Sequence, residues 1–516
     1  MTELLAAPAL PKTLPASRWI CPFCPLLCEH LGVDTVALPV NLAGADCPRA
    51  KQRLADLLGA PAPATPTLNG QPITLDAALW AAAGILQTSR QPLLGGLGTD
   101  VSGGRALYRL ATVTGAISDS AQGPALTQGQ RALQDRGGYS TTLAELRTRA
   151  DLVVCVGAVF ADIAPLFLDR CVLPPRTAGV VGEAPPRQVV VLGPAGTPSP
   201  AEAAALARLA ADTRVALQVV PLQGDLHNTV ALLAALVAGR EPPAASFNLT
   251  PTQLQAALFN PPPTQLPAAL LNPTPSWPLA DPSIDPPHEP PDPSPITPPI
   301  TPPAAPPMQA LQALADQLRA ASYSVIVGAP GLLPVHGGLV IEAVHHIVEQ
   351  LNLKTRAAAL WLGGGEGAAT VNQVFTWLSG LPLRSRAGPA GLEHEPVCFD
   401  ATRLLADGAV DALLWVSSFD ATMLPPATRC PRIVFGPPAL GAALHAAPAS
   451  GGQTVFIPVA TPGIHIAGDL FRTDGTVLLP LVPLPVPPPP RDNAGLPPLA
   501  VVVQRLLTMI SPGTPA

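Results

Sequence analysis

The stretch LAELRTRADLVVCVG, residues 143–157, shows the organisation of the chain most clearly. Residues 143–149 have the pattern of a short helix, and residues 152–157 form an uninterrupted apolar strand that ends at a glycine. A short, fully apolar strand directly after a helix is typical of a parallel sheet that is covered by helices on both faces. The stretch therefore indicates an α/β fold.

The same alternation continues along the chain in both directions. Further apolar strands are expected at 92–96, 188–192, 324–328, 412–416 and 432–435. Helical spacing predicts helices at 75–87, 105–112, 201–211, 308–320, 339–349, 371–378 and 499–510. From this order we expect two doubly wound, Rossmann-like α/β lobes behind a small N-terminal cysteine-cluster domain.

Proline breaks this pattern in the middle of the chain. Between Pro282 and Pro307, 13 of 26 residues are proline, which cannot donate sheet hydrogen bonds and favours polyproline II. We therefore expect a surface insert or linker there. The predicted division is a cysteine domain at 1–60, a lobe at 61–240, the insert at 241–307, a second lobe at 308–480, and a proline-rich segment with a helix at 481–516.

Composition excludes several classes of protein. The 516 residues carry a net charge of -6, and only three of the 29 basic residues are lysines, so nucleic acid and anionic membranes are not expected partners. Long uncharged stretches are broken by Pro, Gly and His, which argues against a membrane-spanning helix. The N-terminus has an early acid and no basic region, unlike a signal peptide. We expect a cytoplasmic protein.

Four cysteines near the N-terminus, Cys21, Cys24, Cys28 and Cys47, have the spacing C-x2-C-x3-C-x18-C. Thiolates at such short separations suit a metal, and a disulfide framework is not expected in a reducing cytoplasm. The spacing favours a [4Fe–4S] cluster, with zinc second and an empty vestigial site third. His30 is close enough to complicate the ligand count.

Other candidate residues have simpler interpretations. We expect the four remaining cysteines to be buried structural thiols. The glycine runs 95–98 and 363–367 follow apolar strands but lack a P-loop lysine or a full dinucleotide motif, so tight turns are the preferred interpretation. His345 and His346 point about 100° apart on a helix and are not expected to share a metal. No nucleophile-elbow motif supports a triad of Asp225, His227 and Ser17 or Ser102.

The run Cys21-Pro-Phe-Cys24-Pro-Leu-Leu-Cys28 resembles the cluster motif of the formylmethanofuran dehydrogenase B subunit, a molybdopterin oxidoreductase with a formate dehydrogenase-like fold. Further segments resemble that family in the same order and extend the likeness over nearly the whole chain except the proline-rich insert. They are LQDRG (133–137), TLAELRTRAD (142–151), NQVFTW (372–377) with the nearby Gly380-Leu-Pro382, residues 401–416 with DALLWV at their end, PGI (462–464) and FRTDG (471–475).

The resemblance implies a tungsten- or molybdenum-bis-pterin centre beside one [4Fe–4S] cluster, but this sequence departs from it. Counting without gaps places Ala125 and Leu126 where the family has its metal-ligand cysteine and the following histidine, and neither can ligate a metal or transfer a proton. No Cys or His occurs between Pro48 and Val154. We therefore expect the metal–pterin centre to be lost.

Two further departures support this expectation. The resemblance implies a catalytic arginine near the turn at 328–338, but no arginine occurs between Ala320 and Thr355, and His336 is the only ionisable residue of that turn. Where the family has Asp-Pro-Arg for the pterin nucleotide, this chain has Gly193-Pro194-Ala195. It offers no carboxylate for a guanine edge and no guanidinium for a phosphate.

The pattern is most similar to the B subunit of the bacterial formyltransferase/hydrolase complex of methylotrophs. The resemblance implies three partners: an amidohydrolase-like A subunit with the hydrolytic metal chemistry, a C subunit, and a formyltransferase D subunit. In that complex a formyl group passes from tetrahydromethanopterin to a methanofuran-type carrier and leaves as formate, in one-carbon oxidation. The leading hypothesis is a non-redox structural subunit, although the family's class is oxidoreductase. The alternatives are an active tungsten or molybdenum dehydrogenase subunit and a cluster-only electron-transfer module.

Overall fold

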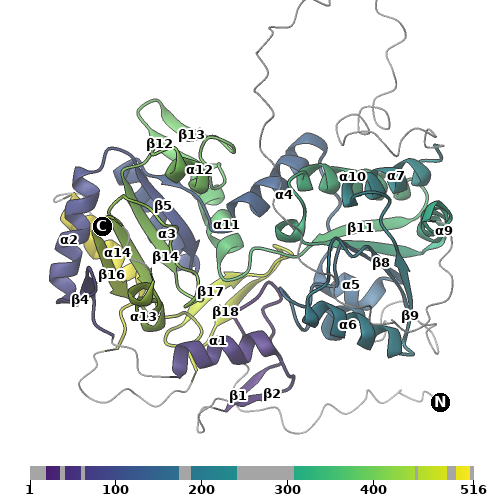
Figure 1. Ribbon diagram of the computed structural model, residues 1–516, viewed down its shortest axis with the longest axis horizontal. Helices are drawn as coiled ribbons and strands as arrows, with labels where there is room; N and C mark the ends of the chain where they lie inside the picture. Colours follow the sequence, from purple (N-terminus) through teal and green to yellow (C-terminus); the bar gives the residue numbers. More distant parts are fainter. Residues whose placement is uncertain are drawn as a thin grey trace, which may run out of the picture.

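The computed structural model describes residues 19–34, 41–59, 64–173, 187–240, 307–447, 451–484 and 495–511. Most of them form two α/β lobes, each built on its own largely parallel sheet (Figure 1). We call the lobe with the nine-stranded sheet lobe I and the lobe with the five-stranded sheet lobe II. The predicted fold class, a cysteine-bearing N-terminal part with two doubly wound lobes, is confirmed.

Lobe I has the strand order β13-β12-β6-β5-β14-β15-β16-β3-β4. Its five central strands run parallel, and two antiparallel hairpins close its edges. The strands are β3 (Thr67–Leu68), β4 (Gln71–Pro72), β5 (Pro92–Gly98), β6 (Ile117–Ser118), β12 (Ser385–Gly388), β13 (Gly391–His394), β14 (Ala412–Ser417), β15 (Arg432–Gly436) and β16 (Thr454–Pro458).

Helices cover both faces of this sheet because its central strands are apolar on both sides. Leu94 and Leu414 belong to the core beneath α2 (Leu75–Thr88), α3 (Val101–Thr114), α11 (Ala368–Ser379) and α14 (Leu499–Ile510). Leu93 and Leu413, their neighbours in sequence, belong to the core beneath α12 (Ala401–Ala406) and α13 (Pro438–Ala446). Adjacent strand residues point to opposite faces, so each continuous apolar run serves two cores.

Lobe II has the order β11-β10-β7-β8-β9, and all its strands are parallel. The strands are β7 (Leu152–Val156), β8 (Arg187–Leu192), β9 (Val215–Val220), β10 (Tyr323–Gly328) and β11 (Arg356–Trp361). One face packs on α7 (Leu226–Val237), α9 (Pro307–Ala320) and α10 (Gly337–Leu351). The other packs on α5 (Leu143–Arg149), α6 (Pro200–Ala211), the π-helix η1 (Leu168–Val172) and the cysteine-bearing N-terminal part.

The two lobes are interleaved in sequence, which differs from the predicted consecutive lobes at 61–240 and 308–480. Lobe I takes β5 and β6 from the first segment and β14 to β16 from the second, whereas lobe II joins β7 to β9 with β10 and β11. The joining contacts are β5 with β14 and β7 with β10. Strand pairing between distant segments leaves no periodic signal, so sequence pattern alone did not reveal it.

The remaining elements connect the lobes. The N-terminal part contains the hairpin β1 (Gly32–Asp34) and β2 (Asn41–Ala43) and then α1 (Pro48–Leu58). Helix α4 (Gly123–Arg136) follows β6 of lobe I but packs on α10 of lobe II. The hairpin β17 (Gly468–Phe471) and β18 (Leu478–Leu481) lies between the lobes (Figure 1).

Local sequence explains where the predicted elements begin and end. Thr142 caps α5 by accepting a hydrogen bond from the backbone N–H of Glu145 at 3.1 Å, a typical capping pair. Helix α3 ends at Gly115, whose φ of +65° suits glycine. The helices and strands predicted from pattern are all present, within a few residues of their expected bounds.

Some predictions fall outside the described residues. The proline-rich insert lies outside them except for Pro307, the first residue of α9. The same holds for residues 485–494 of the C-terminal proline-rich segment. In the part of the chain that is described, no helix is long and apolar enough to cross a membrane.

Candidate functional site

Three of the four predicted cysteine ligands lie on one closed turn, which we call the cysteine loop (residues 21–28). The backbone N–H of Cys21 donates to the carbonyl of Cys28 at 2.9 Å, and that of Leu27 donates to the carbonyl of Cys24 at 3.3 Å. Leu27 has φ +43°, a left-handed conformation that helps the chain to fold back. The loop is buried against lobe II.

The fourth cysteine, Cys47, arrives at the start of α1. It is the N-cap residue, directly before Pro48, and its side chain makes no capping hydrogen bond. Cys47 belongs to the same buried cluster as the cysteine loop, and all four thiols are free. The four predicted ligands are therefore gathered in one buried region.

The four thiols share one electrostatic environment. Burial raises the pKa of Cys21 and of Cys47, and the nearby Cys28 raises both further. A hydrogen bond between Cys24 and Cys28 raises the pKa of Cys24 and lowers that of Cys28 to about 7, helped by Arg170 of lobe II. Three of the thiols are thus held protonated unless a bound cation offsets the charge of their thiolates.

The four buried cysteines could fit a metal cluster. Within the described ranges, no group of three or more His, Cys, Asp or Glu side chains is placed to hold one ion. A structural zinc needs four ligands about 2.0–2.3 Å from one centre, whereas the cysteines of a [4Fe–4S] cluster bind different irons. His30 is exposed, whereas the four cysteines are buried.

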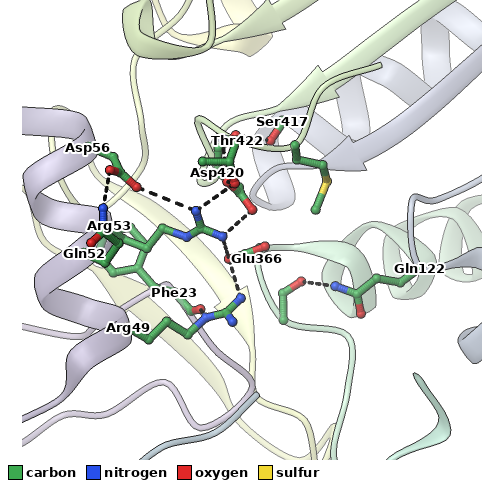
Figure 2. A network of polar contacts seen from close by, with 12 residues as sticks. Phe23, Arg49, Gln52, Arg53, Asp56, Gln122, Glu366, Ser417, Asp420 and Thr422 are labelled. Atoms are coloured by element: carbon green, nitrogen blue, oxygen red, sulfur yellow. Dashed lines mark hydrogen bonds and ion pairs between the residues drawn. The ribbon is translucent and has the colours of Figure 1, made fainter. Parts of the chain in front are cut away.

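A buried ionic network ties α1 to the rest of the molecule (Figure 2). Arg49 contacts the carboxylate of Glu366 at 2.7 Å, and Arg53 contacts the same oxygen at 3.3 Å. Arg53 also pairs with Asp420, which follows β14 of lobe I. Burial raises the pKa of Glu366, and the two arginines oppose that rise. The network joins the N-terminal part, the glycine loop (363–367) and lobe I.

A cavity of about 610 Å³ lies beside this network, between the lobes. Both positions identified as degenerate, Ala125 and Leu126, line it from α4. The turn that lacks the expected arginine also lines it, and a side-chain carbon added at Gly331 would lie 3.8 Å from the Cβ of Ala125. Ala125, Leu126 and this turn therefore border the same cavity, and its lining among the described residues includes no cysteine or carboxylate. The main lining residues besides these are Pro25, Arg49, Gln122, Gln128, Leu133, Leu332, Leu333, His345, Trp361, Gly363, Gly364, Gly365 and Thr473.

The glycine loop at the edge of this cavity is already bonded within the protein. The amide oxygen of Gln122 accepts from the N–H of Gly364 at 3.0 Å, and its NH₂ donates to the carbonyl of Gly365 at 3.2 Å. The N–H of Gly363 donates to the hydroxyl of Thr473 at 3.3 Å. A phosphate cradle needs such N–H groups to be free for the ligand, so the structure supports the interpretation of this run as a tight turn.

The other candidates are placed apart from the cavity or engaged elsewhere. Ala195 of the predicted nucleotide turn donates its N–H to the carbonyl of Gly157 at 3.0 Å and does not line the cavity. Asp225 caps α7 through the N–H of Asn228, Ser102 bonds to Asp100, and Ser17 lies outside the described residues, so no triad is assembled among those described.

The histidine pair and the remaining cysteines are also placed. His345 accepts a hydrogen bond from the Trp361 indole at 3.3 Å, whereas His346 contacts Glu349, so the two do not form one metal site. Cys155 and Cys171 are buried as predicted. The prediction is wrong for Cys398, which is exposed because it lies in the turn between β13 and α12, and Cys430 is only half-buried.

Sequence reasoning missed the residues that organise the site: Gln122, Arg49, Arg53, Glu366 and Asp420. Two signals were available. Arg49 and Arg53 are four residues apart on the helix that follows Cys47, and Glu366 is the one charge inside a glycine run. Neither signal identifies the partner, because the contacts span more than 300 residues.

Comparison with known proteins gives these features a context. No protein-family model matches the chain. A curated relative, the B subunit of the formyltransferase/hydrolase complex Fhc of Methylorubrum extorquens, is 28% identical over 417 residues, which are 78% of this chain and 87% of the relative. The crystal structure of the FhcABCD complex from the same species, in complex with methylofuran, contains a chain with TM-score 0.61 and 25% identity, covering 87% of this chain and 99% of that one.

These similarities extend over both lobes and are not confined to the cysteine motif. The predicted resemblance to the B subunit of the formylmethanofuran dehydrogenase family, in its bacterial formyltransferase/hydrolase form, is confirmed. The chain is therefore similar in sequence and in fold to one component of a multi-subunit complex.

Proposed function

We propose that this chain is the B subunit of a formyltransferase/hydrolase complex and that it is a structural subunit without redox chemistry of its own. Its similarity to the Fhc B subunit supports the first part. The second part rests on the cavity between the lobes. Two of the three departures in sequence, the pair Ala125 and Leu126 and the arginine-free turn around Gly331, line this one space.

The residues around the cavity do not fit a tungsten- or molybdenum-bis-pterin group. Such a metal needs a strong protein ligand, and the described lining residues include no thiol and no carboxylate. The imidazole of His345 lines the cavity, but its Nε2 accepts a hydrogen bond from the Trp361 indole. Pterin phosphates need free donors, but the Gly363 and Gly364 amides are engaged, and Arg49 is paired with Glu366.

The proposed partners are the A, C and D subunits of the same complex, in keeping with the four-subunit relative. By resemblance, hydrolysis belongs to the A subunit and formyl transfer to the D subunit, in tetrahydromethanopterin-linked oxidation of formaldehyde to formate. The task of this chain is then to bind its partners in a fixed arrangement. We also propose a cytoplasmic location, because all eight cysteines are free.

Purification of the complex, formed by co-expression of this chain with its A, C and D subunits, tests the proposal. We expect formate release from the formylated carrier together with less than about 0.1 tungsten or molybdenum per chain by elemental analysis. A matched variant, Ala125→Leu, narrows the cavity and should leave formate release unchanged. Stoichiometric tungsten or molybdenum, or reduction of a viologen dye by formylmethanofuran, would overturn the proposal in favour of an active dehydrogenase subunit.

We further propose that the four cysteines hold a [4Fe–4S] cluster that stabilises the N-terminal part. Their burial and mutual electrostatic contact support a tetrathiolate site, with zinc or an empty site as the alternatives. When bound, the cluster would cross-link the cysteine loop and α1, since metal binding free energy becomes folding free energy. A content of about four irons per chain would support it. A reversible absorbance change with dithionite would favour the electron-transfer module instead.

A further inference from the structure

Helix α1 follows Cys47 and packs on the core through Ala50, Leu54, Leu57 and Leu58. Of its eleven residues only Ala50 and Leu54 are buried. Cys47 nevertheless is only 4% exposed and lies in the same core cluster as the cysteine loop. Most of the apolar contacts of α1 come from its later turns, and only Ala50 is buried in the first turn, so the end that follows Cys47 has room for a further restraint.

The ionic network supplies that restraint. Arg49 and Arg53 follow Cys47 by two and six residues, and both contact one oxygen of Glu366. Arg53 contacts Asp420 as well, and Arg49 also donates to the carbonyl of Phe23 in the cysteine loop. The side chains of Glu366 and Asp420 are 5% and 8% exposed, so solvent screens these ion pairs little.

The backbone at Glu366 is held independently of the arginines. Glu366 has φ +55°, between two glycines that permit close approach of backbone. A side-chain carbon at Gly367 would lie 2.1 Å from the carbonyl oxygen of Thr99, and one at Gly365 would lie 3.0 Å from Pro25. The loop is thus wedged between lobe I and the cysteine loop, and Glu366 is a rigid anchor for α1.

Asp420 is fixed in a similar way. One of its carboxylate oxygens accepts hydrogen bonds from the backbone N–H and the hydroxyl of Thr422, at 2.7 and 2.6 Å. Its backbone carbonyl accepts from Ser417 at the end of β14. The other carboxylate oxygen is left to contact Arg53. Figure 2 shows Arg53 between these two anchors.

We propose that Glu366 and Asp420 are positioning residues for the four-cysteine site. They hold α1 by its arginines and so keep Cys47 beside the cysteine loop, although they lie more than 300 residues away in sequence. The part of this inference that concerns metal rests on the proposed cluster. The placement of Cys47 does not depend on that cluster, and it can be measured without any metal.

The test compares wild-type chain with Glu366→Gln, Asp420→Asn and the double variant. Apo protein is treated with iodoacetamide under native conditions, and labelling of each cysteine is followed by mass spectrometry. We expect the double variant to label Cys47 at least tenfold faster than wild type. Exposed Cys398 should react in every sample and buried Cys155 in none, which distinguishes release of α1 from general unfolding.

Control variants make the outcome decisive. Asp407→Asn removes an exposed ion pair with Arg403 on α12 and should leave Cys47 protected. If Glu366→Gln fails to fold, Arg53→Lys keeps the charge but loses the forked contacts, and should raise Cys47 labelling severalfold. Labelling of Cys47 as slow as in wild type, in the double variant or in Arg53→Lys, overturns the proposal.

Metal content gives a second measurement. If wild-type chain binds about four irons, the double variant should retain less than half of them after identical anaerobic reconstitution. Unchanged iron content in the double variant would contradict the positioning role. If wild-type chain binds no iron or zinc, the proposed cluster is wrong, while the labelling experiment still decides whether Glu366 and Asp420 position Cys47.

Discussion

The cysteine loop and the cavity between the lobes are neighbours, since Pro25 and Arg49 line the cavity, but they differ in chemistry. The cysteine region has four thiols, with arginines on two sides. The cavity has the space for a ligand but carries Ala125 and Leu126 where metal-binding groups are expected. The thiols, which can hold the fold together, are present, whereas the metal-ligand and acid–base side chains expected at positions 125 and 126 are missing. This contrast supports the proposal that the thiols serve structure.

The two regions also differ in how their polar groups are satisfied. Around the cysteines, Arg49, Arg53 and Glu366 form ion pairs between separate parts of the chain. At the cavity, the carboxamide of Gln122 bonds to the glycine loop, and its hydrogen bonds are used within the protein. The ion pairs around the cysteines link separate elements of the fold, whereas the hydrogen bonds of Gln122 leave few free donors for a ligand in the cavity.

The largest effect on iron content and stability is expected from the double variant Cys24→Ser, Cys28→Ser. These changes remove half of the proposed ligands, so the chain should lose its iron and become less stable by several kcal/mol, because metal binding contributes to folding. Iron analysis and urea denaturation of the anaerobic protein measure both. Cys398→Ser, at an exposed site, should change neither. Equal stability of the double variant and wild type would show that the cysteines do not stabilise the fold.

A pH effect on stability of about 3 kcal/mol is expected from Asp119, which directly follows β6 of lobe I. The size follows from about 1.4 kcal/mol per pKa unit. Burial raises the pKa of Asp119 to about 6, although Arg384 opposes the rise. Because the folded pKa exceeds the ordinary value of 3.8, the stabilisation is present below about pH 4 and is lost as pH rises through 6.

Urea denaturation of wild type and Asp119→Asn at about pH 4, 5, 6 and 7 measures this effect. The unfolding free energy of wild type should fall relative to that of the variant between about pH 4 and 6.5. A constant difference between the two proteins over that range would mean that Asp119 does not titrate there.

A smaller effect is expected from Gln122→Ala. It removes two hydrogen bonds to the glycine loop and leaves the Gly364 N–H without its partner, which should cost about 1–3 kcal/mol. Hydrogen exchange at Gly364 should accelerate, and iron content should not change. Gln128→Ala, on the same helix and cavity, is the matched control and should leave Gly364 exchange unaltered. Loss of iron in Gln122→Ala would show that the two regions are not separable.

The smallest effect on stability is expected when the ligand residues that the family resemblance implies are introduced at positions 125 and 126. Ala125→Cys with Leu126→His restores the expected residue types, but the arginine-free turn and the bonded glycine loop remain. We expect no viologen reduction and a change in stability below about 0.5 kcal/mol, as is usual at positions that are not fully buried. Uptake of tungsten or molybdenum by this variant would show that the cavity still accepts the metal–pterin group.

The sequence by itself determined the fold class and the main strands and helices, and it supplied the candidate cysteine ligands and the two positions predicted to be degenerate. These depend on local signals: apolar runs such as 152–157, the cap formed by Thr142 and Glu145, and short cysteine spacing. Residue identity alone was enough to show that Ala125 and Leu126 cannot act as ligands.

Only the tertiary structure decided the interleaving of the lobes and the setting of the site. The pairing of β5 with β14, and the contacts of Glu366 with Arg49 and Arg53, join segments hundreds of residues apart. Propensity and periodicity describe one segment at a time, whereas these contacts depend on which surfaces meet when the chain closes on itself. The same closure brings Ala125 close to Gly331, so that both line one cavity.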